Sequence, residues 1–163
     1  MKKIDFDQTL QLLGNAGVIV GILLLVYELN QNRDMMEAQT RHEIAQSIVE
    51  QLGEIASNGD LADLTRRARC GRLESEVEEE RYFAHVNSRL RYWEDAHYQY
   101  RRGLYDETEF SAQREAWRAF IHPGATQEAW NQMKLSFSSE FVREIDDLIA
   151  NTNDQGFVIS RCD

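Results

Sequence analysis

Glu94 and His97 come closest to a catalytic or metal-binding pattern in this chain. A Glu-x-x-His motif on a helix places a carboxylate and an imidazole one turn apart. Di-metal sites in helical bundles use two copies of this motif with two further glutamates. No second Glu-x-x-His occurs in the 163 residues, and His97 also continues an apolar stripe. We therefore expect a core histidine at position 97 and no metal.

Other reactive patterns are missing from the sequence. There is no Gly-x-Ser-x-Gly motif and no glycine-rich phosphate loop, so neither a serine nucleophile nor a nucleotide site is indicated. We expect neither catalysis nor a cofactor. An alternative is a binding module that holds a small apolar ligand among its aromatic side chains, with Trp93, His97 and Tyr100 at the centre of the pocket.

The elements that would position these side chains start with an apolar segment from Leu10 to Leu29. Twenty helical residues span about 30 Å, which matches the hydrocarbon core of a bilayer. The segment lacks the small-residue cleavage site of a signal peptide and the polar face of a soluble core helix. It therefore predicts a single transmembrane helix. No proline or glycine separates Leu29 from Met35, so we expect this helix to continue into the soluble part.

The membrane side of the soluble part is less strongly indicated. Lys2, Lys3 and the free amino group lie before the apolar segment, and Arg33 and Arg41 lie just after it, so the N-terminal side carries one positive charge more. This slight excess favours a cytoplasmic N-terminus and a domain outside, which in a bacterium is the periplasm. Cys70 and Cys162 leave the compartment open, because they suit either a disulfide in an oxidising compartment or two thiols in a reducing one.

One face of the apolar segment suits contact with another helix. Gly17 and Gly21 lie one turn apart, Gly14 and Gln11 lie on the same side, and Asn15 lies beside them. Small residues let two membrane helices approach closely, and polar side chains can hydrogen-bond across the pair. This face predicts association with a second copy or with another membrane protein.

The remaining residues indicate helices. The formal charge of −10 and the pI near 4.9 argue against nucleic acid as a partner and against broad adhesion to anionic lipid. Four arginines from Arg66 to Arg72 precede five glutamates from Glu74 to Glu80, and we expect the two groups to pair. Apolar stripes at helical spacing follow the anchor. They are Arg41, Ala45, Ile48, Leu52 and Ile55 in one helix, and Phe83, Val86, Leu90, Trp93, His97, Tyr100 and Leu104 in another.

Helix-start signals divide the soluble part further. We expect caps at Asp60, Ser75, Asp106, Thr126 and Ser138 or Ser139, and helix stops at Asn58-Gly59, Gly71 and His122-Pro123-Gly124. The predicted fold is all-α, with one N-terminal transmembrane helix that continues into a small helical bundle. Its expected parts are a tail (1–9), a membrane helix (10–29), a bundle (30–150) and an irregular C-terminal tail (151–163).

The segments Leu13 to Gly21, Tyr27 to Asn32 and Arg91 to Ala96 resemble those of an uncharacterised group of bacterial proteins with one N-terminal membrane helix and a helical remainder. The resemblance implies a bacterial inner-membrane protein and supplies no reaction or ligand. Together with the anchor, it favours an interaction protein that self-associates or serves as an accessory subunit of a larger membrane complex.

Overall fold

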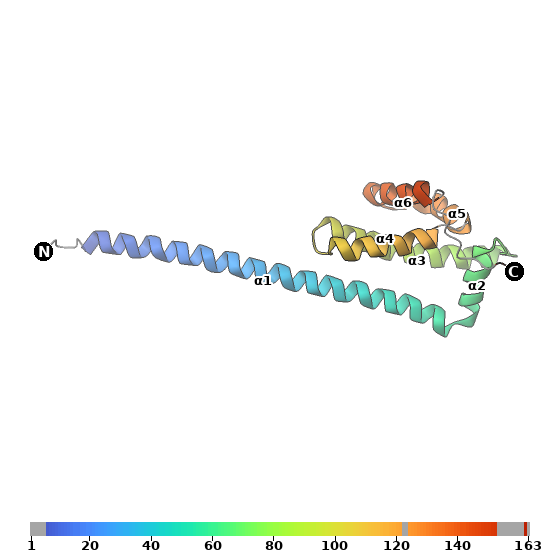
Figure 1. Ribbon diagram of the computed structural model, residues 1–163, viewed down its shortest axis with the longest axis horizontal. Coiled ribbons are helices and arrows are strands. Elements are labelled where there is room, and N and C mark those ends of the chain that lie inside the picture. The colour runs from blue at the N-terminus through green and yellow to red at the C-terminus, as the bar shows by residue number, and fades with distance from the viewer. Residues whose placement is uncertain (1–5, 122–123, 153–161, 163) are drawn as a thin grey trace. The chain divides into compact units, whose positions relative to one another are not determined.

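The structure is a computed structural model that describes residues 6–121, 124–152 and 162. Within these residues every regular element is a helix, and this confirms the predicted all-α class (Figure 1). The elements in chain order are α1 (Phe6–Ser57), α2 (Gly59–Arg69), α3 (Glu76–Arg101), α4 (Glu107–Ile121), α5 (Gly124–Met133), the 3₁₀ helix η1 (Lys134–Ser136) and α6 (Ser139–Thr152).

Helix α1 contains the apolar segment and continues for 52 residues without a break. The continuation expected from the lack of proline or glycine after Leu29 is therefore present. The chain forms two compact units, residues 1–39 and residues 40–163. Within the described residues, α1 is the one helix that is long and apolar enough to cross a membrane.

The part of α1 inside the second unit buries a face that matches the expected stripe only in part. Ile48 and Ile55 of that stripe are half-buried and pack against the core. Ile44 and Thr40 are the buried residues here, at 4% and 8% exposure, whereas Arg41, Ala45 and Leu52 are exposed. The Tyr92 hydroxyl of α3 donates a hydrogen bond to the Ile44 carbonyl oxygen at 3.3 Å, which links this part of α1 to the bundle.

The core of the second unit is rich in aromatic side chains. Helix α3 is its central element, and it packs against α2, α4 and α5. Trp93 of α3 stacks on Trp117 of α4, with ring centroids 4.9 Å apart. Trp130 of α5 and Phe141 of α6 are fully buried and meet edge to face. The predicted stripe on α3 is largely confirmed, since Val86, Leu90, Trp93 and His97 are buried; Tyr82 and Ala96 join them.

Local side-chain caps explain where α2, α3 and α4 begin. Asn58 caps α2 through its side chain, which accepts a hydrogen bond from the Leu61 amide; the predicted cap at Asp60 is wrong, because Asp60 already lies in the first turn. Ser75 caps α3 as expected. Asp106 caps α4 by accepting from the amides of Thr108 and Glu109 at 2.8 and 3.3 Å.

The predicted start at Thr126 is also wrong. Helix α5 begins at Gly124, and Thr126 is a fully buried residue within it. Its hydroxyl lies 2.7 Å from the hydroxyl of Tyr82 on α3, so it joins two helices instead of capping one. The predicted stop at His122-Pro123 and most of the predicted irregular tail lie outside the described residues.

Candidate functional site

Glu94 and His97 are both engaged in packing or local hydrogen bonds. The Glu94 carboxylate accepts a hydrogen bond from the Ser138 amide at 2.7 Å and one from Arg91 at 3.0 Å. His97 lies between the rings of Phe110 and Phe141, and burial lowers the pKa of its imidazole. Within the described part of the chain, no group of three or more His, Cys, Asp or Glu side chains is placed to hold a metal ion.

The three residues of the predicted ligand pocket have different surroundings. Tyr100 stacks on Phe110 with centroids 4.0 Å apart and donates a hydrogen bond to Glu107. His97 contacts Phe110 from another direction. Trp93 lines a groove that His97 and Tyr100 do not line.

This groove has a volume of about 520 Å³ and lies between α1, α3 and α4. Its α1 wall includes Arg41, Ala45, Ile48 and Leu52, which are four of the five residues in the stripe predicted for this helix. Most of the stripe therefore borders an open groove, while Ile48 and Ile55 also pack against the core. Most of the remaining wall is apolar or aromatic, with Tyr92 and Trp93 from α3 and Trp117 from α4.

Arg89 of α3 is the unusual member of the groove wall. Its Nε is buried and has no hydrogen-bond partner within the described residues. The guanidinium carbon lies 4.5 Å above the Phe120 ring, a favourable cation–π position. Burial lowers the pKa of Arg89 because a low-dielectric environment disfavours the charged form. A cation is thus held beside the groove without an ion-pair partner among the described residues.

Two neighbouring groups share this environment. Burial lowers the pKa of His85, one turn before Arg89, and the positive charge of Arg89 lowers it further. Burial also raises the pKa of the Tyr92 hydroxyl. His85 is therefore disposed to be neutral, so that Arg89 carries the positive charge of this part of α3.

The predicted pairing of basic and acidic residues holds for one arginine of the cluster. Arg67 forms a bidentate ion pair with Glu78, at 2.7 and 2.8 Å, and these hydrogen bonds lower the pKa of Glu78. Arg66 pairs instead with Asp63 on its own helix.

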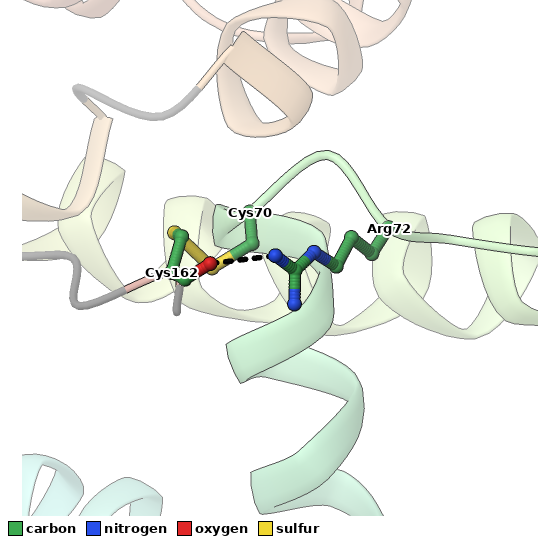
Figure 2. The surroundings of a disulfide bond; sticks show 3 residues. All are labelled: Cys70, Arg72 and Cys162. Atoms are coloured by element: carbon green, nitrogen blue, oxygen red, sulfur yellow. Dashed lines mark hydrogen bonds between the residues drawn. A yellow bond between two sulfur atoms is a disulfide. The ribbon is translucent and has the colours of Figure 1, made fainter.

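A disulfide joins Cys70 to Cys162, with Cα atoms 5.6 Å apart (Figure 2). Of the two alternatives that the sequence left open, the structure contains the bonded one. Cys70 follows α2 directly, at its C-cap. Arg72 donates a hydrogen bond to the Cys162 carbonyl oxygen at 2.6 Å beside the bond.

No protein-family model, curated protein or solved structure matches this chain.

The predicted helix-association face is exposed throughout. Gln11, Gly14, Asn15, Gly17 and Gly21 all lie on the solvent-exposed part of α1. A Cβ atom added at any of the three glycines would meet nothing within 4 Å. The face is therefore open for contact with another molecule.

Sequence reasoning missed the groove and Arg89. A signal was present, because His85, Arg89 and Tyr92 follow one another at four- and three-residue spacing beside the apolar stripe. Such spacing places them along one side of the helix. A positive charge among aromatic residues on one side of a helix could have indicated the site.

Proposed function

We propose that this protein is a membrane-anchored helical interaction module that self-associates or serves as an accessory subunit of a membrane complex. The observation that carries the proposal is the exposure of the apolar segment. Its large apolar side chains, from Leu10 to Leu29, are each 49–69% exposed. Burying apolar surface releases about 25 cal/mol per Å², so a bilayer is the cover that suits twenty consecutive residues of this kind.

Two other kinds of apolar helix fit these observations less well. A core helix of a soluble protein would be buried by its own chain, but none of the most apolar window is buried. A signal peptide has a short apolar region that ends at a cleavage site. Here the helix continues to Ser57, and its last turns pack on the bundle through Ile44, Ile48 and Ile55.

The disulfide favours one orientation. Disulfides persist in oxidising compartments and are rare in the cytoplasm, so the bond between Cys70 and Cys162 favours a domain outside the cytoplasm. The N-terminus is then cytoplasmic, in agreement with the slight excess of positive charge that the free amino group gives to the N-terminal side. In a bacterial inner membrane, the domain would face the periplasm.

Association through the membrane helix is supported by the open face at Gly17 and Gly21. Without side chains, these positions leave room for the backbone of a second helix to approach. Gln11 and Asn15 supply amide groups that can hydrogen-bond to a partner within the membrane. The proposal includes no catalysis.

Membrane insertion is tested by alkaline carbonate extraction of the full-length protein. We expect the chain to stay in the membrane pellet with Met1 intact and with both cysteines protected from a thiol reagent until reduction. Recovery of intact chain in the soluble fraction would overturn the anchor, and reactive thiols before reduction would overturn the orientation.

Association is tested with an in-membrane two-hybrid assay and by mass spectrometry of the native complex. Gly17→Ile and Gly21→Ile fill the open face, so each should reduce the association signal. Leu24→Ile conserves volume elsewhere on the helix and is the matched control. Two results together would refute the interaction module. They are equal association signals from all variants and a native mass spectrum that contains the chain only as a monomer without a partner.

A further inference from the structure

The groove between α1, α3 and α4 combines an apolar wall with one unpaired cation. Ile48 and Leu52 of α1 face it from one side, and Trp93 and Trp117 form part of the opposite wall. Its volume of about 520 Å³ lies within the range of roughly 300–1,000 Å³ that is usual for small-molecule sites. The space and the surface therefore suit a small ligand with an apolar body.

Arg89 specifies the polar end of such a ligand. Its Nε is closed off from solvent and has no hydrogen-bond partner in the described residues. A partly buried guanidinium without an anion beside it costs free energy, because it loses hydration and gains no ion pair. A carboxylate matches the planar donor fork of arginine and can accept two hydrogen bonds from it.

The other charged groups around the groove limit the ligand to a single negative charge. Arg41 and Glu109 both line the groove, and they neutralise each other in an ion pair of 2.8 Å. Glu54 of α1 acts on Arg89 electrostatically without forming an ion pair with it. Arg89 therefore supplies at most one positive charge to a ligand, which suits a monoanion better than a phosphate.

We propose that this groove binds a monocarboxylate with an apolar chain, such as a medium-chain fatty acid. Its carboxylate accepts hydrogen bonds from the Arg89 guanidinium, and its chain lies along Ile48, Leu52 and the two tryptophans. The exposed stripe on α1 then has a partner, since it forms the wall against which the chain packs. This site goes beyond the proposed interaction function, because it requires neither membrane insertion nor helix association.

The site is tested by contact quenching of tryptophan fluorescence in the full-length protein, held in phosphatidylcholine nanodiscs. The probes are 8-bromooctanoate and 8-bromooctanol, which share a chain and differ in the charged group. Bromine quenches an indole that it touches, and two of the three tryptophans line the groove. Titration of nanodiscs that carry an unrelated tryptophan-containing membrane helix corrects for partition of the probes into lipid.

We expect 8-bromooctanoate to quench at a concentration at least tenfold lower than 8-bromooctanol. Arg89→Met should raise the octanoate midpoint at least tenfold and leave the octanol midpoint unchanged, which also shows that the groove is still folded. Arg143→Met removes the same charge from a side chain that is 75% exposed on α6, so it should change neither midpoint. Ala45→Phe narrows the groove and should weaken both probes.

Three results would overturn the proposal. The first is an equal midpoint for the two probes in the unmodified protein, and the second is an Arg89→Met variant that binds like Arg143→Met. The third is a groove covered by a second copy of the chain, which would appear as a dimer by light scattering with no saturable quenching by either probe.

Discussion

The hydrogen bond between Tyr82 and Thr126 joins α3 to α5 inside the core, and its removal should be costly in a specific way. The two hydroxyls are 2.7 Å apart, and the residues are 3% and 0% exposed. Tyr82→Phe removes one hydroxyl and leaves the other buried without that partner. An unsatisfied buried hydroxyl costs about 1–3 kcal/mol, and we expect this loss in the free energy of unfolding. Thr126→Val should cost a similar amount for the same reason.

The double variant Tyr82→Phe/Thr126→Val separates this cause from a general loss of packing. Replacing both partners with apolar groups of the same shape is nearly neutral, so the double variant should be more stable than the sum of the two single changes by about 1–3 kcal/mol. Tyr98→Phe, at a residue 52% exposed, is the matched control and should change stability by less than about 0.5 kcal/mol. The assay is urea unfolding of the full-length protein in non-ionic detergent, followed by tryptophan fluorescence. Additive costs in the double variant would refute the reasoning.

Three further predictions concern the core, the covalent link and the response to pH. Trp93→Ala should lower the free energy of unfolding by about 3–5 kcal/mol, because Trp93 is 4% exposed and stacks on Trp117. Leu135→Ala, at a residue 97% exposed, is the control, and a similar loss in both variants would contradict the packing assignment. Cys70→Ala/Cys162→Ala opens a loop of 92 residues and should lower the free energy of unfolding by up to about 4.6 kcal/mol. The measurement is urea unfolding of this variant and of the oxidised chain, and an unchanged urea midpoint would show that the disulfide does not stabilise the fold. His85 and His97 have pKa values lowered from 6.5, mainly by burial, so below that pH the unfolded chain binds more protons than the folded one. The free energy of unfolding should therefore fall as the pH drops below 6.5, and His85→Gln and His97→Gln should each reduce this pH dependence in urea unfolding; a pH dependence that neither change reduces would contradict the assignment.

The helical class and most helix positions could be predicted because local patterns determine them. The stripe from Val86 to His97 repeats at helical spacing for three turns, and Ser75 and Asp106 cap their helices with their own side chains. Each of these signals lies within a few residues of the structure that it specifies. The absence of a helix breaker after Leu29 was likewise enough to predict the continuous α1.

The features that could not be predicted depend on contacts between distant residues. Asn58 and Asp60 are both good caps, and two residues of separation do not decide between them. Threonine is a common N-cap residue, but Thr126 lies in the core, where its hydroxyl is hydrogen-bonded to that of Tyr82, 44 residues away in the sequence.

The groove was hidden for the same reason. Ile44, which is buried, and Leu52, which is exposed, both border the groove. Periodicity alone cannot distinguish a groove wall from a core. Arg89 looks like an ordinary surface arginine until the surrounding helices are in place.

The position of the disulfide also determines how the protein responds to a pulling force. Tension applied between the N-terminal helix and the C-terminal end reaches Cys70 and passes through the sulfur bridge to Cys162, because that path is the shortest covalent one. The 92 residues of sequence separation between the two cysteines carry none of this tension. A stretched chain of that length measures about 300–330 Å. The segment between the two cysteines cannot extend in this way as long as the disulfide is intact. Reduction would release it, so a reductant converts a short, stiff tether into one that can unravel helix by helix under load.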